Sequence, residues 1–508
     1  MIFLTTAPEH LADVEAALAR EVRLAELVDV VVAVASPMAE VAEPAGFGEL
    51  TVTVDGVTAD LDWAESLPPV VLARPLPFDE SNLLTLIYLR LGNWEKAYEH
   101  AAPKRALSDD VDLLNRLQGG VPLAAVPGAP LNDVGSFDHY RRWHNRAVAL
   151  HYGQLPRPAN ASDLQAAYQQ AIAAAPDAEW RAFSTKHYAT FLLDNGQLSV
   201  ARQQLAAALA LENLSKAARY ELLSVETGVL LQQLTVPYDA DLLTETKDKL
   251  WQVLQYYERQ QRPLNAALTL LDAAQVANFS GSFAEALGYL NRAVAALSQE
   301  DAPELLANAQ YRKGVLLFTW AQNGNPQFYR GALDAYLQAL KVFTRNEAFP
   351  VFAEIQHHLG VIYSEIPDEA KKKSIWAAVS VSSFNQALEY FTRETHPYEY
   401  ATICNHYANA LTKYPLTLKT DKFAKALGLY REALAVRTAA AYPYERALTL
   451  LNFLEAAWEV NLEHDPAPEN LLAEMTRYAE EMPDLVSDAA LAATAREHLG
   501  RLAAVQLE

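Results

Sequence analysis

The stretch Tyr398–Leu411, YEYATICNHYANAL, decides the fold because its frame recurs along the chain. Copies begin at Pro350 and Pro443, and a weaker copy begins at Pro303. The copies follow one another at about 46–48 residues, a period typical of stacked helical units rather than of one closed globule. Such a stack exposes a long curved surface, which suits binding better than chemistry.

Composition narrows the class of protein further. The chain has 508 residues, of which 51% are apolar, enough for three ordinary domains or one long solenoid. A net charge of −22 disfavours binding to nucleic acid and to anionic membranes, and its plainest role is to keep the chain in solution. The single Cys404 excludes an internal disulfide framework and fits a reducing compartment. With no signal peptide and no long apolar run, we expect a soluble cytoplasmic protein without membrane contact.

Residues 1–75 differ from the rest and predict a small α/β module. The expected elements are a strand at Ile2–Thr5, a helix capped by Thr6, a buried strand at Val28–Ala35, a hairpin turning at Asp55-Gly56, and a further candidate strand at Val70–Ala73. The module lacks a Gly-rich phosphate loop and carries only His10 as a ready base. An enzyme hidden in this module is therefore the weakest of the functional hypotheses.

The remainder of the chain is predicted to be helical. We expect a first helical repeat at 76–117, a Gly/Pro-rich linker or surface loop at 118–136, and a continuous helical region at 137–508. Shorter proline-containing breaks, such as those at Pro237, Pro367 and Pro415, are expected between helices, where proline costs little.

Small and aromatic residues recur at fixed offsets within each helical unit. One set is Ala273, Ala274, Ala277, Gly281, Phe283, Ala286, Leu290 and Ala293; a second is Ala189, Leu192, Gly196, Leu198, Ala201, Leu205 and Ala208; a third is Tyr407, Ala408, Leu411, Phe423, Ala426, Tyr430 and Ala433. The small residues would let one helix approach its neighbour closely. The offsets resemble the tetratricopeptide repeat (TPR), a helix–turn–helix unit of about 34 residues.

The later units are longer, with expected loops after Leu411 and at Glu365–Ser374, and with second helices such as Tyr430–Leu434, YREAL. They resemble the long bacterial form of the repeat. The resemblance covers residues 78–500, in about eight units, and implies a mostly α fold: an α-solenoid wound as a right-handed superhelix, with the small α/β module at its N-terminus. Other α-solenoids remain the alternative.

The resemblance also implies a place for partners. In such families, ligand peptides lie on the concave face, which the first helices line. The candidates on these helices are Arg312, His357, His358, Asn405, His406, Asn409 and Asn452. Asn405 and Asn409 lie one helical turn apart and share a face, and their amides suit an extended peptide backbone. The alternative interpretation is that these side chains are solvated or form hydrogen bonds between helices.

Metal binding and nucleophilic catalysis are disfavoured. His357 and His358 point about 100° apart on a helix, and His358 and His406 are expected too far apart to share an ion. No metal site and no cofactor are therefore predicted. Cys404 is predicted to be a buried structural residue, with His406 on the other side of its helix. Lys371–Lys373 are predicted to lie in a solvated loop, with contact to an acidic partner as the alternative.

The leading hypothesis is a non-catalytic scaffold or adaptor that binds a peptide or helix of a protein partner. The alternative is a ligand-gated regulator, in which a peptide or metabolite changes the shape of the superhelix. The identity of the partner and the oligomeric state stay open at this point.

Overall fold

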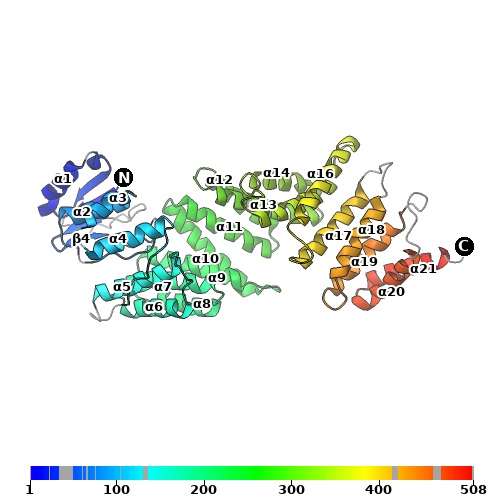
Figure 1. The fold of residues 1–508 in the computed structure, drawn as a ribbon, viewed down its shortest axis with the longest axis horizontal. Coiled ribbons are helices and arrows are strands. Elements are labelled where there is room, and N and C mark those ends of the chain that lie inside the picture. Colours follow the sequence, from blue (N-terminus) through cyan, green and yellow to red (C-terminus); the bar gives the residue numbers. More distant parts are fainter. Residues whose placement is uncertain are drawn as a thin grey trace. The chain divides into compact units, whose positions relative to one another are not determined.

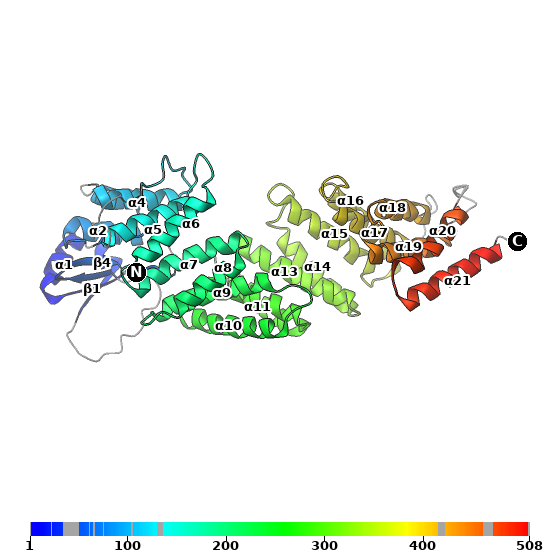
Figure 2. The ribbon, with the colours of Figure 1, turned by 90° about the horizontal axis from the view of Figure 1, so that it is seen from below.

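The chain forms two compact units, Met1–Val276 and Ala277–Glu508, in a computed structural model. The structure describes residues 2–21, 23–33, 50–59, 61–64, 67–74, 76–102, 105–129, 136–414, 422–460 and 471–505. Helices dominate both units, and strands occur in the described part only at the N-terminus (Figures 1 and 2). The mostly α fold with a small N-terminal sheet is therefore confirmed.

The first unit begins with a four-stranded sheet. Its strands are β1 (Ile2–Thr6), β2 (Val28–Val32), β3 (Leu50–Thr53) and β4 (Gly56–Ala59), in the order β2-β1-β3-β4. β1 runs parallel to both β2 and β3, while β3 and β4 form the predicted antiparallel hairpin. Gly56 closes that hairpin with φ +139°, a conformation that L side chains rarely adopt. The predicted first strand and hairpin are confirmed. A strand also forms at Val28–Val32, but the prediction that it is buried is wrong, because β2 lies at the edge of the sheet and Val31 is 51% exposed. Residues 34 and 35 lie outside the described part.

Two details of the N-terminal prediction are wrong. Thr6 does not cap a helix, because it is the last residue of β1 and its hydroxyl bonds the Ala7 carbonyl. A short 3₁₀ turn at Pro8–His10 comes between the strand and α1 (Leu11–Arg20). Val70–Ala73 does not form a strand, because the backbone partners of these residues are side chains of helices, described below.

The apolar core continues from the sheet into the next helices. α2 (Glu80–Arg90), α3 (Trp94–Ala101) and α4 (Arg105–Gln118) share one cluster of buried side chains with the sheet, from Ile2 to Val111. Packing is thus continuous across residues 75–76, where the sequence suggests a module boundary. The predicted 118–136 linker follows α4: residues 119–129 form no regular structure, and residues 130–135 lie outside the described part.

Helix hairpins make up the rest of the first unit. The helices are α5 (Phe137–Tyr152), α6 (Ala161–Ala174), α7 (Ala178–Asp194), α8 (Leu198–Leu209), α9 (Lys216–Gln233), α10 (Ala240–Arg259) and α11 (Pro263–Phe279). α5 packs on α6, α7 on α8 and α9 on α10, while α7 also packs on α9. The turn after α7 uses Gly196 at φ +68°, and the amides of Gly196 and Gln197 bond the last carbonyls of the helix.

The second unit continues the pattern. Its helices are α12 (Phe283–Leu297), α13 (Pro303–Gln322), α14 (Tyr329–Ala339), α15 (Phe349–Glu365), α16 (Ala370–Leu388), α17 (Pro397–Lys413), α18 (Lys422–Val436), α19 (Pro443–Ala457), α20 (Leu471–Leu485) and α21 (Ala489–Val505). α13 pairs with α14, α15 with α16, and α17 with α18. A proline occupies the first turn of α13, α15, α17 and α19, where its missing N–H costs nothing, which explains the recurring frame.

The predicted close approach of helices at small residues is visible in the hairpins of the second unit. A Cβ at Gly314 would come within 2.6 Å of the Tyr336 ring, and one at Gly360 within 2.9 Å of Phe384. Each glycine on a first helix therefore makes room for an aromatic ring from the second helix. The same role explains why Ala408 and Ala426 are fully buried where α17 meets α18.

The predicted Lys371–Lys373 loop is wrong in part. α16 begins at Ala370, so the three lysines lie in its first turn. Lys372 pairs with Asp368 at 3.4 Å, and this ion pair offsets the unfavourable placement of a cation at a helix N-terminus. None of the helices in the described ranges is long and apolar enough to cross a membrane.

Candidate functional site

The chain takes a long route between β4 and α2. β4 packs against α2, and the Val57 amide donates to the Leu76 carbonyl at 2.8 Å, so the chain is back at the sheet by residue 76. The intervening residues, described at 61–64 and 67–74, lie instead against α4, α5, α7 and the start of α11. We call them segment 61–74. A direct connection would need only a few residues, so this excursion requires its own explanation.

Asn145 on α5 holds the middle of segment 61–74. Its Oδ1 accepts from the Val71 amide and its Nδ2 donates to the Val71 carbonyl, both at 2.8 Å. One side-chain amide thereby satisfies both backbone groups of one residue, as a neighbouring strand would. The sequence predicts a strand at Val70–Ala73, but no strand lies beside these residues. The Asn145 side chain supplies the backbone hydrogen bonds that a neighbouring strand would make with Val71.

His144 supplies a second backbone contact. Its Nε2 lies 2.8 Å from the Pro69 carbonyl oxygen and its Nδ1 lies 2.8 Å from the Ser184 hydroxyl. Burial lowers the pKa of His144 to about 4, so the ring is neutral near pH 7. A carbonyl can only accept, so Nε2 carries the proton, and Nδ1 accepts from Ser184. Ser184 thus orients the ring that holds the segment.

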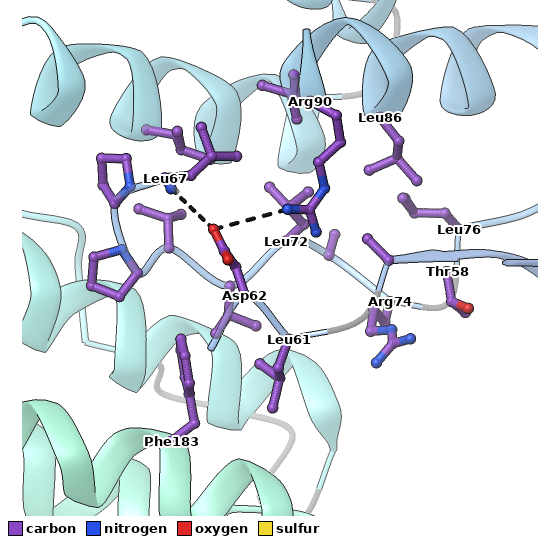
Figure 3. Close-up of a pocket in the computed structure, with 18 of the residues that line it drawn as sticks. Thr58, Leu61, Asp62, Leu67, Leu72, Arg74, Leu76, Leu86, Arg90 and Phe183 are labelled. Atoms are coloured by element: carbon purple, nitrogen blue, oxygen red, sulfur yellow. Dashed lines mark hydrogen bonds and ion pairs between the residues drawn. The ribbon is translucent and has the colours of Figure 1, made fainter. Parts of the chain in front are cut away.

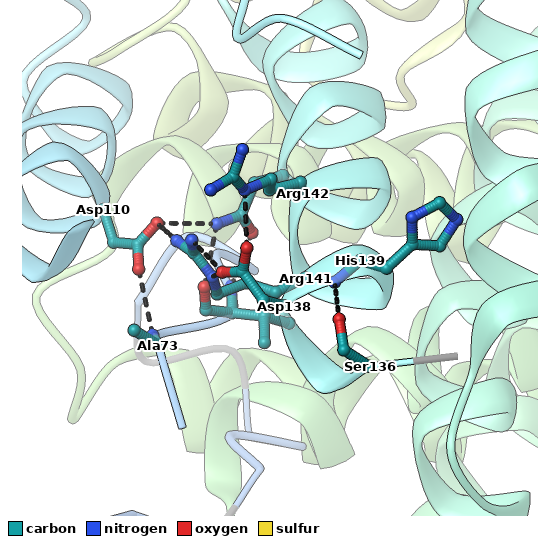
Figure 4. A network of polar contacts seen from close by, with 9 residues as sticks. Ala73, Asp110, Ser136, Asp138, His139, Arg141 and Arg142 are labelled. Atoms are coloured by element: carbon teal, nitrogen blue, oxygen red, sulfur yellow. Dashed lines mark hydrogen bonds and ion pairs between the residues drawn. The ribbon is translucent and has the colours of Figure 1, made fainter. Parts of the chain in front are cut away.

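A buried ionic network holds the C-terminal end of the segment (Figure 4). The Ala73 amide donates to Asp110 Oδ2 at 2.9 Å, and Asp110 Oδ1 pairs with Arg141. Arg141 also reaches Asp138 through its Nε at 3.0 Å. Burial raises the pKa of Asp110 to about 7, although Arg141 and the Ala73 amide act in the opposite direction. A carboxylate this buried is retained only because several donors surround it.

Trp63 anchors the N-terminal end. Its indole Nε1 donates to Glu179 Oε1 at 2.8 Å, and its ring meets Phe183 edge-on at 5.2 Å between centroids. Arg262 donates to the Ala64 carbonyl at 3.4 Å, and its other nitrogen pairs with Glu221 at 2.6 Å. The segment is thus bound at both ends and in the middle by five side chains: Asp110, His144, Asn145, Glu179 and Arg262. We call these five residues the binding face.

Few side chains of the segment are buried. Trp63 and Val71 are buried, at 6% and 3% exposed, whereas the other described residues of the segment are half-buried. A cavity of about 80 Å³ lies beside it, lined by Leu86 and Leu89 of α2, Leu114 of α4 and Phe183 of α7 (Figure 3). In the same view Asp62 accepts from the Leu67 amide at 3.0 Å and faces Arg90 at 3.9 Å.

No residue of the binding face is among the site residues predicted from the sequence. The available signals are weak: adjacent polar residues, His144-Asn145, within a helix, and a Pro68-Pro69 pair followed by two valines. Each is common in proteins. Asn145 and Val71 are 74 residues apart, so no local pattern pairs them.

The predicted site residues of the second unit fall into three groups. Four form contacts between successive first helices: His357 Nε2 lies 2.8 Å from His406 Nδ1, and Asn452 donates to Asn405 at 3.5 Å. We call His357, His406, Asn405 and Asn452 the polar row, which spans α15, α17 and α19. Asn405 is 8% exposed, and the other three are half-buried.

The remaining three lie elsewhere. His358 bonds the Tyr336 hydroxyl at 2.8 Å and stacks on Phe318, so it belongs to hairpin packing. Asn409 accepts from the Tyr430 hydroxyl of α18 at 2.6 Å. Asn405 and Asn409 thus contact different neighbouring helices, which agrees with the alternative interpretation that these side chains form hydrogen bonds between helices. Arg312 lies half-buried on α13.

The histidines that meet are a pair that the sequence analysis did not consider. His357 and His406 are in contact because α15 and α17 pack directly on one another. Within the described residues, no group of three or more His, Cys, Asp or Glu side chains is placed to hold a metal ion. Cys404 is fully buried as predicted, and burial raises the pKa of its thiol to about 11, which suits a structural residue rather than a nucleophile.

Comparisons with known proteins do not assign this chain to a family. No protein-family model matches the chain, and no curated protein matches its sequence. Among solved structures, a monomeric mutant of IFIT1 with m7Gppp-AAAA has 12% identity and a TM-score of 0.36, over 83% of this chain and 80% of that one. The TPR domain of P58(IPK) has 15% identity and a TM-score of 0.23, over 84% and 98%.

A third structure, the APC/C hetero-tetramer Cut9-Hcn1, has 14% identity and a TM-score of 0.27, over 83% of this chain and 89% of that one. TM-scores this low carry no argument about function. The fold assignment rests on the helix hairpins and their register, and by these the chain is a TPR-like α-solenoid with an N-terminal sheet.

Proposed function

We propose that this chain is a non-catalytic scaffold whose helix hairpins bind extended segments of partner proteins. One observation carries the proposal: helices of the first unit hold an irregular stretch of chain through hydrogen bonds to its backbone. Recognition of an extended peptide uses this chemistry, with backbone bonds for affinity and pockets for alternate side chains.

The polar row of the second unit is the corresponding candidate surface there. Its imidazoles and amides offer both donors and acceptors, and three of its four members are half-exposed. In the structure these groups bond one another, at 2.8 Å between the histidines and at 3.5 Å between the asparagines. The longer contact is weak, so an incoming peptide group would replace it at little cost.

A display library of unstructured peptides, screened against the full-length chain, tests this proposal. We expect enrichment of peptides whose binding weakens at least about tenfold, roughly 1.4 kcal/mol, on Asn405→Ala or Asn145→Ala. The matched control is Asn385→Ala, an exposed amide on the second helix α16, which should leave binding unchanged. Failure to enrich any peptide above background would overturn the proposal.

One observation favours the alternative function, a ligand-gated regulator. The binding face is already covered by the chain's own segment, so any ligand for that face must first displace it. Small-angle scattering of the full chain with and without a selected peptide separates the two functions. A change in the scattering curve on binding supports the regulator, and identical curves support the scaffold.

A further inference from the structure

We propose that segment 61–74 is an internal ligand of the first unit, and that a partner peptide of the same chemistry displaces it. The partner class is a peptide that follows the same turned path, with a tryptophan next to an acidic residue, then a proline-containing stretch ending in a β-branched residue, spaced as are Trp63 and Val71. This inference rests on the proposed function and deepens it by naming a face and a peptide class.

The first support is the path of the chain. The Val57–Leu76 contact already returns the chain to the sheet, so the excursion adds nothing to the connection of β4 with α2. Long irregular loops in compact proteins are uncommon and usually functional. What this one achieves is to place residues 61–64 and 67–74 against helices that lie far away in the sequence.

The second support is the kind of contact. Asn145, Asp110, His144 and Arg262 all contact backbone atoms of the segment, so any extended peptide can satisfy them. Selectivity comes from few side chains. Trp63 meets Phe183 and Glu179, and Asp62 faces Arg90, whose side chain is 10% exposed. These contacts define the acidic residue and the tryptophan of the partner class.

The third support is that the segment buries few of its side chains. Among its described residues only Trp63 and Val71 are buried, and a cavity of about 80 Å³ remains beside Val71, where protein interiors are normally filled. The segment nevertheless acts at the effective concentration of a tethered ligand, on the order of millimolar. A free peptide with equal contacts is therefore expected to bind poorly until the tethered copy is weakened.

Fluorescence anisotropy with a labelled synthetic peptide of residues 61–74 tests this inference. The intact chain should bind it weakly, whereas the full-length double variant Trp63→Ala/Val71→Asp should bind it at least about tenfold more tightly. Adding Asn145→Leu to the double variant should abolish the gain, while adding the exposed control Asn385→Leu should not. A double variant that melts cooperatively and binds no peptide would sink the inference.

Hydrogen exchange on the unmodified chain keeps the test valid if the double variant fails to fold. The Val71 and Ala73 amides, which donate to Asn145 and Asp110, should be protected in the free chain. Their exchange should change on addition of millimolar peptide, as the tethered copy leaves and exchanges freely. Unchanged protection at that concentration counts against displacement.

The two proposals fail separately. If library peptides bind in a way that depends on Asn405 but the 61–74 peptide does not bind, the proposed scaffold function stands. The proposal that segment 61–74 is an internal ligand is then wrong. If the chain forms concentration-dependent dimers and Trp63→Ala abolishes them, the binding face binds a second copy of the chain. The proposed class of partner peptide is then wrong.

Discussion

The binding face of the first unit and the polar row of the second unit use similar side chains in different ways. On the binding face, the Asn145 amide and the His144 imidazole of α5 contact the backbone of segment 61–74 at 2.8 Å. In the second, imidazoles and amides on α15, α17 and α19 engage one another. Half-buried polar groups need partners, and these side chains accept either a peptide or each other. Polar side chains on first helices can therefore bind a peptide, or they can form hydrogen bonds with other parts of the same chain.

The largest expected effect on stability comes from replacing Glu221. This effect should be confined to the first unit. Glu221 lies between Lys186 at 2.8 Å and Arg262 at 2.6 Å, and is 3% exposed. Glu221→Ala leaves two buried cations without their anion and should destabilise the first unit by about 3–5 kcal/mol. Denaturant unfolding should show one early transition, with the transition of the second unit unchanged. Glu26→Ala, which breaks an exposed pair, is the control, and should be nearly neutral.

Acid should weaken both units because buried histidines in each stay neutral. Burial lowers the pKa of His144 and His406 to about 4 and of His358 to about 3. The unfolded chain binds these protons near pH 6.5, so stability is full above that pH and falls as pH drops towards 4. His144 alone should account for roughly 2 kcal/mol at pH 5. Thermal melts of His144→Gln between pH 7 and 5 should show a shallower loss than the unmodified chain; equal slopes would contradict this.

Glycine substitutions separate close packing from helix propensity within the second unit. Gly360→Ala puts a Cβ 2.9 Å from the Phe384 ring and should cost about 1–3 kcal/mol. Gly428→Ala on α18 has nothing within 4 Å of the new Cβ and should stabilise the helix by about 0.5–1 kcal/mol. Melting temperatures that move in the same direction for both variants would show that the hairpin does not need the close approach.

The last prediction compares the two surfaces directly, through Asn145 of the binding face and Asn405 of the polar row, and it includes the smallest expected effect. Asn145→Ala orphans two backbone groups of Val71 and should cost at least about 2 kcal/mol, with faster exchange of the Val71 amide. Asn405→Ala removes only a 3.5 Å contact to Asn452 and should stay within about 0.5 kcal/mol. A larger loss for Asn405 than for Asn145 would mean that the polar row is structural and the segment incidental.

Much of the fold was predictable because its signals are local. Prolines in first turns, glycines facing aromatic rings and the β3–β4 turn at Gly56 each depend on residues close in sequence. The site was less predictable. The sequence placed Asn405, His406 and Asn452 on first helices, but not the neighbour that each side chain contacts. Asn409 shows why: one turn from Asn405, it bonds Tyr430 of α18 instead.

The sequence alone thus determined that this chain is built of stacked helix hairpins, since the helix period and the offsets of small and aromatic residues repeat from one hairpin to the next. Only the tertiary structure decided which polar groups meet. His357 reaches His406 across 49 residues and Asn145 reaches Val71 across 74. Such pairs depend on the spacing between packed helices and on the route of an irregular segment. Neither leaves a periodic trace in the sequence, because a single side chain fixes each contact.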